Sequence, residues 1–151
     1  MLGRLSHTAI CVRDLDVSVA FYEKLGLHKF FEFTNDDAMG GAVVGVEASK
    51  VRMAFMRLGD NPQEPFLDIV QFVDAPTPGE AYPTLNNVGI TRVAFTVDDI
   101  DPVYERLKEM EVEFVTPLQR LTTPAGDPLA MVCFKDPDGS FLEIISGLKV
   151  G

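Results

Sequence analysis

The chain has 151 residues, of which 46% are hydrophobic and 24% charged, a composition that fits one globular domain and excludes a disordered segment. No apolar run approaches the roughly 18 residues of a membrane-spanning helix, and the first residues show no secretory signal, so we expect a cytoplasmic protein. The 13 basic and 23 acidic residues give a net charge of −10, which argues against binding to nucleic acids or to anionic membrane surfaces.

The first half of the chain predicts a strand followed by a helix. A β-rich run over 7–12 ends at an acidic cluster, where Asp14 or Asp16 is a natural N-cap because a short carboxylate accepts the unpaired amides of a first helical turn. The pattern predicts a helix over 17–25, which Gly26 ends in a left-handed conformation. The apolar stripe expected on this helix consists of Val17, Ala20, Phe21 and Leu25.

Three more strands are expected before the middle of the chain. A strand over 27–33 leads into a glycine-containing loop over 34–50, which we expect to be flexible. A hairpin then joins 51–58 to 66–72 through a turn rich in Gly, Asp, Asn and Pro. The first half is therefore a βαβββ unit, whose sheet has a face that it cannot bury alone.

The second half repeats this order at a constant offset of 85 residues for the first strand and helix. Residues 6–16 align with 91–101 and share an alanine, a valine and two aspartates. Asp99 or Asp101 is the expected N-cap, whereas Glu111 stands where the first copy has a glycine, a stop for which the sequence offers no explanation. The expected strands are 92–97, 112–115, 129–134 and 141–145, and the expected helix is 102–110.

Two groups of residues carry a resemblance to a known family. The first group is His7, Ile10, Val12, Asp14, Leu15, Ser18, Phe21, Tyr22, Leu25 and Gly26, and the second is Asp136, Pro137, Asp138, Gly139, Leu142, Glu143 and Ile144. Together they resemble the vicinal-oxygen-chelate superfamily, which includes glyoxalase I, methylmalonyl-CoA epimerase, extradiol dioxygenases, fosfomycin-resistance enzymes and bleomycin-binding proteins.

The resemblance implies a fold and a set of partners. The fold is α+β, in which two tandem βαβββ modules form a curled mixed sheet around a cup-shaped cavity. One domain would span 1–151, with module one at about 1–73, a connector at about 74–87 and module two at about 88–151. The resemblance also implies a homodimer, a small-molecule ligand, and a divalent metal that binds two neighbouring substrate oxygens.

Four positions correspond to the family's metal-ligand positions: His7, Asp68, Arg92 and Glu143. The resemblance implies that His7, Asp68 and Glu143 bind the metal, that Asp68 and Glu143 are also the catalytic carboxylates, and that Arg92 binds substrate. A carboxylate in the apolar strand around Glu143 is costly to bury unless it is paired or metal-bound. A structural His7, a solvated Asp68 and an edge-strand Glu143 facing water remain the alternatives.

Arg92 departs from the family, which usually has histidine there. A guanidinium has only donors and cannot coordinate a metal, so the metal is absent if Arg92 takes the ligand's place. In one arrangement Arg92 turns aside and binds a substrate carboxylate or phosphate while the other three residues hold the metal. In a second, Arg92 pairs with Glu143 or Asp68 and the cup binds ligand without metal; in a third, Arg92 lies on the outer face.

The favoured function is a glyoxalase- or epimerase-like enzyme with isomerase or lyase chemistry on an oxygen-bearing, anionic or aromatic substrate. The 11 phenylalanines, mostly expected in the core, favour an aromatic ligand where they line the cup. A metal-free protein that binds and sequesters a small molecule is the first alternative. A ring-cleaving dioxygenase is the second, although Arg92 removes one of the two histidines that such a site uses.

Overall fold

The computed structural model describes residues 2–37 and 39–149, and the chain divides into two compact units, 1–79 and 80–151. We call them the first and the second unit. Within the residues described, none of the helices combines the length and the apolar character needed to cross a bilayer.

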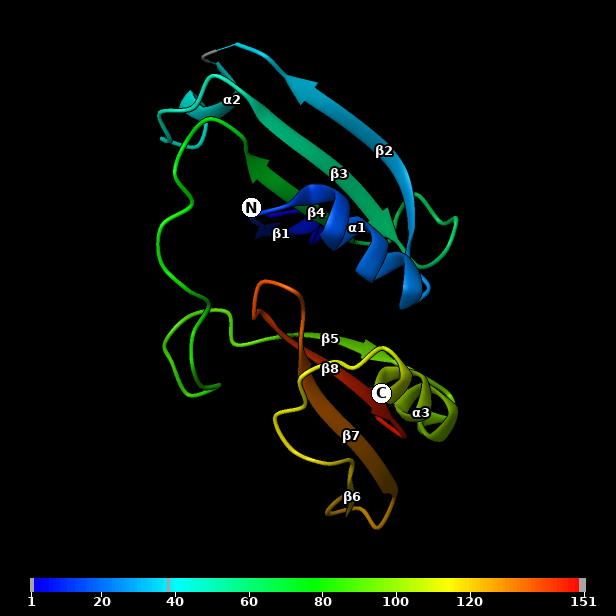
Figure 1. The fold of residues 1–151 in the computed structure, drawn as a ribbon. Coiled ribbons are helices and arrows are strands. Elements are labelled where there is room, and N and C mark those ends of the chain that lie inside the picture. Colours follow the sequence, from blue (N-terminus) through cyan, green and yellow to red (C-terminus); the bar gives the residue numbers. More distant parts are fainter. Residues whose placement is uncertain (1, 38, 150–151) are drawn as a thin grey trace. The chain divides into compact units, whose positions relative to one another are not determined.

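The first unit contains one four-stranded sheet with the strand order β1-β4-β3-β2, in which β1 and β4 are parallel and the other pairs antiparallel (Figure 1). A short helix lies in the stretch that we expected to be a loop. The elements are β1 (His7–Cys11), α1 (Leu15–Lys24), β2 (His28–Asn35), α2 (Met39–Ala42), β3 (Val51–Arg57) and β4 (Phe66–Phe72).

The second unit has the equivalent strand order, β5-β8-β7-β6, again with one parallel pair, β5–β8. Its elements are β5 (Val93–Thr96), α3 (Ile100–Glu109), β6 (Gln119–Thr122), β7 (Pro128–Lys135) and β8 (Phe141–Ser146). Two open mixed sheets, each with a crossover helix between its parallel strands, confirm the predicted α+β fold of tandem βαβββ units.

Helix α1 buries a different face from the one that we predicted. Its buried residues are Leu15, Ser18, Val19 and Tyr22, whereas Val17 is 52% exposed. The predicted stripe was wrong because it left out Leu15. The helix begins two residues before the predicted start, where the Asp14 side chain accepts the amides of Asp16 and Val17 at 3.0 and 3.1 Å. The buried set has the spacing i, i+3, i+4, i+7 of one helical face and packs on the sheet.

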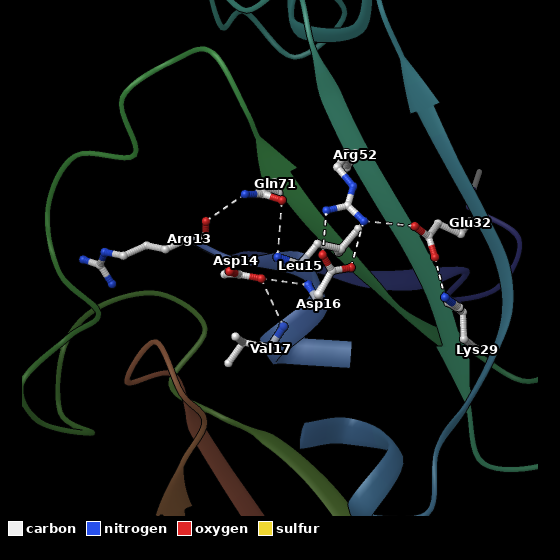
Figure 2. A network of polar contacts seen from close by, with 9 residues as sticks. All are labelled: Arg13, Asp14, Leu15, Asp16, Val17, Lys29, Glu32, Arg52 and Gln71. Carbon is white, nitrogen blue, oxygen red and sulfur yellow. Dashed lines mark hydrogen bonds and ion pairs between the residues drawn. The ribbon is translucent and has the colours of Figure 1, made fainter. Parts of the chain in front are cut away.

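A polar network fastens the start of α1 to the sheet (Figure 2). The Arg52 guanidinium on β3 donates two hydrogen bonds to the Asp16 carboxylate at 2.8 and 3.1 Å and one to Glu32 on β2 at 3.2 Å. The hydrogen bond from Arg52 lowers the pKa of Asp16. From β4, the Gln71 side-chain amide donates to the Arg13 carbonyl at 2.9 Å. These contacts place Arg52 of β3 and Glu32 of β2 on the helix side of the sheet.

The two helices end in the same backbone conformation. Gly26 has a φ of 98° and Glu111, 85 positions later, has a φ of 55°, so both are left-handed. A left-handed residue after the last turn satisfies helix carbonyls, and here the amides of Gly26 and Glu111 donate to Glu23 and Lys108. Glu111 therefore ends its helix in the way that glycine does, at a conformational cost that glycine avoids.

The strand that we predicted over 112–115 was wrong. The segment forms only an isolated bridge between Phe114 and Phe134, and the strand that pairs with β7 is β6, over Gln119–Thr122. Pro117 lies between them and has no amide to donate, so a ladder cannot run through it. The pairing therefore breaks after Val115, whose amide still donates to Cys133, and resumes beyond the proline.

Candidate active site

The parallel ladders of the two units place two acidic residues at equivalent points. Asp68 on β4 lies opposite Ala9 on β1, and Glu143 on β8 lies opposite Ala94 on β5. Because Ala9 and Ala94 are themselves 85 positions apart, the units share one register. Side chains alternate along a strand, so the two carboxylates occupy equivalent faces of their sheets, as the sequence alignment predicted.

Asp68 is a buried carboxylate without a full set of hydrogen bonds. The residue is 8% exposed, and its Oδ1 atom is buried with no hydrogen-bond partner. Burial raises the pKa of this carboxyl group, and the nearby His7 lowers it by a smaller amount. A buried carboxylate oxygen without a donor is costly, and such groups are concentrated at functional sites.

His7 lies on the strand next to Asp68, at the position that the alignment predicted. Its ring stacks on Phe66 with 5.2 Å between the ring centroids, and its Nδ1 lies 3.2 Å from the Ser6 hydroxyl. The residue is exposed. The first unit thus brings His7 and Asp68 together on one sheet face.

Glu143 is buried and paired. It is 3% exposed, because β8 lies inside its sheet between β5 and β7, and Arg92 Nε donates to its Oε2 at 2.7 Å. The Arg92 side chain is 38% exposed, and its Nη1 donates to the Thr91 hydroxyl at 3.4 Å. The contact between Arg92 and Glu143 is the one that the second of our three arrangements requires.

Cys133 is a neighbour of Glu143 that the sequence reasoning missed. The Cys133 thiol lies 3.5 Å from Glu143 Oε2, to which it donates. Burial, followed by the negative charge of Glu143, raises the pKa of this thiol to about 11, so it stays protonated and is a poor nucleophile. The register could have been counted across the turn at 136–139, because that hairpin sets Cys133 opposite Glu143.

Of the predicted metal ligands, His7 and Asp68 lie in the first unit and Glu143 in the second. Among the described residues, no three His, Cys, Asp or Glu side chains form a group able to hold a metal ion. His7 and Asp68 are suitable donors, but the Glu143 oxygen nearest to Arg92 already accepts a cationic donor. A metal at Glu143 would therefore require Arg92 to move, because two cations repel one another at such short range.

Comparison with known families identifies the family to which this chain belongs. Residues 4–144 match the family model described as the Glyoxalase/Bleomycin resistance protein/Dioxygenase superfamily. The chain belongs to this superfamily. The membership covers nearly the whole chain and confirms the resemblance that the sequence motifs carried.

Two relatives match this superfamily member over nearly the whole length of both chains. The uncharacterized protein YwbC of Bacillus subtilis (strain 168) is 26% identical over 145 residues, which are 95% of this chain and 97% of YwbC. The structure of a glyoxalase family protein from Bacillus cereus superposes with a TM-score of 0.82 at 24% identity, covering 99% of this chain and 97% of that one.

A more distant structural relative has a named activity. The fosfomycin resistance protein FosX from Listeria monocytogenes, solved with Mn(II) and a sulfate ion, has a TM-score of 0.60 at 18% identity. The match covers 98% of this chain and 95% of FosX. At that identity the likeness shows a shared glyoxalase fold.

Proposed function

We propose that this protein is a small-molecule enzyme of glyoxalase type that moves a proton on an oxygen-bearing substrate, with Asp68 as the group that carries the proton. The observation that supports the proposal is the buried Asp68 carboxyl group, whose Oδ1 has no hydrogen-bond partner and whose pKa is raised by burial. A general base works best when its pKa is close to the working pH, and burial moves an aspartate in that direction.

The reaction class follows from what an unpaired carboxylate can do. Asp68 would take a proton from a hydroxyl-bearing carbon next to a carbonyl group. The electron pair of the broken C–H bond would form a C=C bond, and the π pair of the carbonyl group would move to its oxygen. In the resulting enediolate the hydroxyl proton would pass to the neighbouring oxygen, and Asp68 would return its proton to the former carbonyl carbon, so that a new carbonyl group forms on the other carbon. The substrate would thus isomerise without an oxidant or reductant. The exposed His7 beside Asp68 is placed to donate a hydrogen bond to a substrate oxygen.

Arg92 in the second unit is a positive group held in place by an ion pair. It uses Nε to bind Glu143, and its side chain is 38% exposed, so its terminal nitrogens are accessible to the carboxylate of an anionic ligand. Glu143 would then be a positioning residue, which holds the guanidinium in one orientation.

Exchange of substrate hydrogen with solvent tests the proposal directly. Proton NMR in deuterated buffer would follow the α-hydrogen of a panel of 2-hydroxy ketones and 2-oxo carboxylates. We expect exchange with the wild type and a loss of roughly 10²-fold or more in Asp68→Asn. Asp60→Asn, a carboxylate on the exposed turn between β3 and β4, is the matched control and should retain full activity. Absence of exchange over the whole panel, or full activity in Asp68→Asn, would overturn the proposal.

A metal-free binding protein is the second candidate, favoured by the satisfied Arg92–Glu143 ion pair. Such a protein would bind an anionic compound tightly and release it unchanged, so a ligand that binds stoichiometrically without hydrogen exchange would support this candidate. We do not propose oxygen-dependent ring cleavage, since Arg92 takes the place of the second histidine that this chemistry needs.

A further inference from the structure

Five phenylalanine rings gather on one face of the first unit's sheet. Phe55 lies near all the others, at centroid distances of 4.8 Å from Phe66, 5.5 Å from Phe31 and 6.0 Å from both Phe30 and Phe33. Phe30 and Phe66 meet edge to face at 5.4 Å. We call these five residues the aromatic face.

A β-bulge in β2 makes the aromatic face larger than a regular strand would allow. Lys29 pairs with Met56 and Phe31 with Phe55, so Phe30 is an extra residue between consecutive positions of β3. In a regular strand, neighbouring side chains point to opposite faces. The bulge lets Phe30 and Phe31 both reach Phe55, and it is the kind of irregularity that re-aims side chains next to functional sites.

Asp68 lies within this aromatic face. Its register partner on β3 is Phe55, and Phe66 precedes it by two positions on β4, so all three side chains share one side of the sheet. The residue is more than nine-tenths buried, and its Oδ1 atom has no partner. The aromatic face therefore surrounds a strong hydrogen-bond acceptor that the protein leaves unused.

Packing alone does not account for these rings. Phe30 is 39% exposed and Phe31 is 50% exposed, on an edge strand and on the face away from α1. The fold does not demand a ring opposite the acid either, because the second unit has Cys133 opposite Glu143 where the first has Phe55 opposite Asp68. The ring opposite the acid is thus particular to the first unit.

We propose that the aromatic face binds a planar aromatic ring that carries a hydroxyl or N–H group, and that this group donates a hydrogen bond to Asp68 Oδ1. The inference rests on the proposed function for the location of the site and narrows its substrate to an aromatic class. Rings pack well on rings at centroid distances like those within the cluster. The donor supplies the hydrogen bond that Asp68 lacks.

An organic cation is the alternative ligand for a cluster of rings around an acid, and Arg57 argues against it. The Arg57 guanidinium lies over the Phe30 ring, 4.4 Å from its centroid. The chain thus already places its own cation against this aromatic face, and a second cation would be repelled. A neutral ring with a donor meets no such repulsion.

Isothermal titration with matched probes tests the inference. The probes are 2-naphthol, its methyl ether, which lacks the donor, and fully saturated decahydro-2-naphthol, which lacks the planar ring. We expect wild-type protein to bind 2-naphthol at least fivefold more tightly than either analogue. Phe31→Leu, at an exposed position, should weaken 2-naphthol binding at least threefold, whereas Phe21→Leu on α1 is the control and should not.

A variant of Asp68 tests separately whether this carboxyl group accepts the hydrogen bond of the ligand. In Asp68→Leu the preference for 2-naphthol over its methyl ether should disappear, while a preference for the planar ring over the saturated one should persist. Equal affinity of the wild type for all three probes, or tighter binding of a trimethylammonium-substituted naphthalene, would overturn the inference. Probe binding without any hydrogen exchange on the substrate panel would leave the aromatic site standing and refute the enzymatic proposal.

Discussion

Removal of the Arg92 guanidinium is the sharpest test of how Glu143 is stabilised. Arg92→Met keeps most of the side chain's length and leaves a carboxylate that is 3% exposed without its cationic partner. Unit charges about 4 Å apart gain ~4 kcal/mol at an effective dielectric of 20. Because the Arg92 side chain is 38% exposed, water screens the pair, and we expect a loss nearer ~2 kcal/mol in the free energy of unfolding.

That loss is large enough to measure. For a chain of this size it corresponds to a melting temperature lower by about 4–8 °C, and urea unfolding followed by circular dichroism gives the free energy directly. Arg120→Met is the matched control, since Arg120 pairs with Asp101 where both side chains are more than half exposed. Exposed pairs are worth ~0–1 kcal/mol.

A second variant separates the ion pair from the loss of packing. If the cost arises from an unpaired buried charge, Glu143→Leu added to Arg92→Met should recover most of the lost stability, because an apolar pair needs no partner. The reasoning is refuted if Arg92→Met costs no more than Arg120→Met, or if the double variant is less stable than Arg92→Met alone.

Four further predictions concern metal binding, pH, a helix end and assembly. Arg92→His should create or tighten a divalent-metal site, measured by competition with a chromogenic chelator; unchanged affinity would count against the alignment of Arg92 with the family's histidine. Burial raises the pKa of Asp68 above its ordinary 3.8, so wild-type stability should fall relative to Asp68→Asn as pH rises from near 3.8 through the folded-state pKa; parallel urea midpoints from acid to neutral pH would contradict this. Glu111→Gly should raise the free energy of unfolding by ~1 kcal/mol, and Gly26→Ala should lower it by a similar amount through backbone strain alone, since no atom lies within 4 Å of the added carbon. We also expect a homodimer, and sedimentation as a monomer at micromolar concentration would disprove it.

Local chemistry made much of the fold readable from the sequence. Asp14 and Asp99 are both N-caps, as the short acidic residues before each helix predicted. The hairpin strands β3 and β4 have nearly the predicted bounds, because Gly, Asp, Asn and Pro mark the turn between them. The repeat at an offset of 85 extends to the helix ends, where Gly26 and Glu111 share a conformation.

The buried face of one helix and the position of one strand were predicted wrongly, for identifiable reasons. The apolar stripe of α1 was assigned from Val17, which left out Leu15, although the buried face consists of Leu15 and the residues spaced from it by helical turns. The second strand of the second unit was placed by apolar content over 112–115, although Pro117 moves regular pairing to β6. In both cases hydrophobicity located a segment, while hydrogen-bond geometry decided its bounds.

The sequence indicated which four positions to consider for the candidate site, but it did not indicate which contacts their side chains make. The spacing of the motifs located Asp68 and Glu143, and their shared register follows from the repeat. Sequence could not decide among three orientations of Arg92, because a long side chain selects its partner in three dimensions. The aromatic face was also beyond sequence reasoning, since Phe30 joins it only through a bulge that no residue type announces.

That bulge lets the aromatic face change by one residue without disturbing the pairing of the strands. If the codon for Phe30 were lost, Lys29 and Phe31 would become neighbours, and their partners on β3, Met56 and Phe55, are already neighbours. The ladder would close without a gap, and the helix side of the sheet would keep its contacts, while one ring would vanish from the opposite side. An inserted or deleted residue on this edge strand can thus reshape recognition while the rest of the fold stays unchanged.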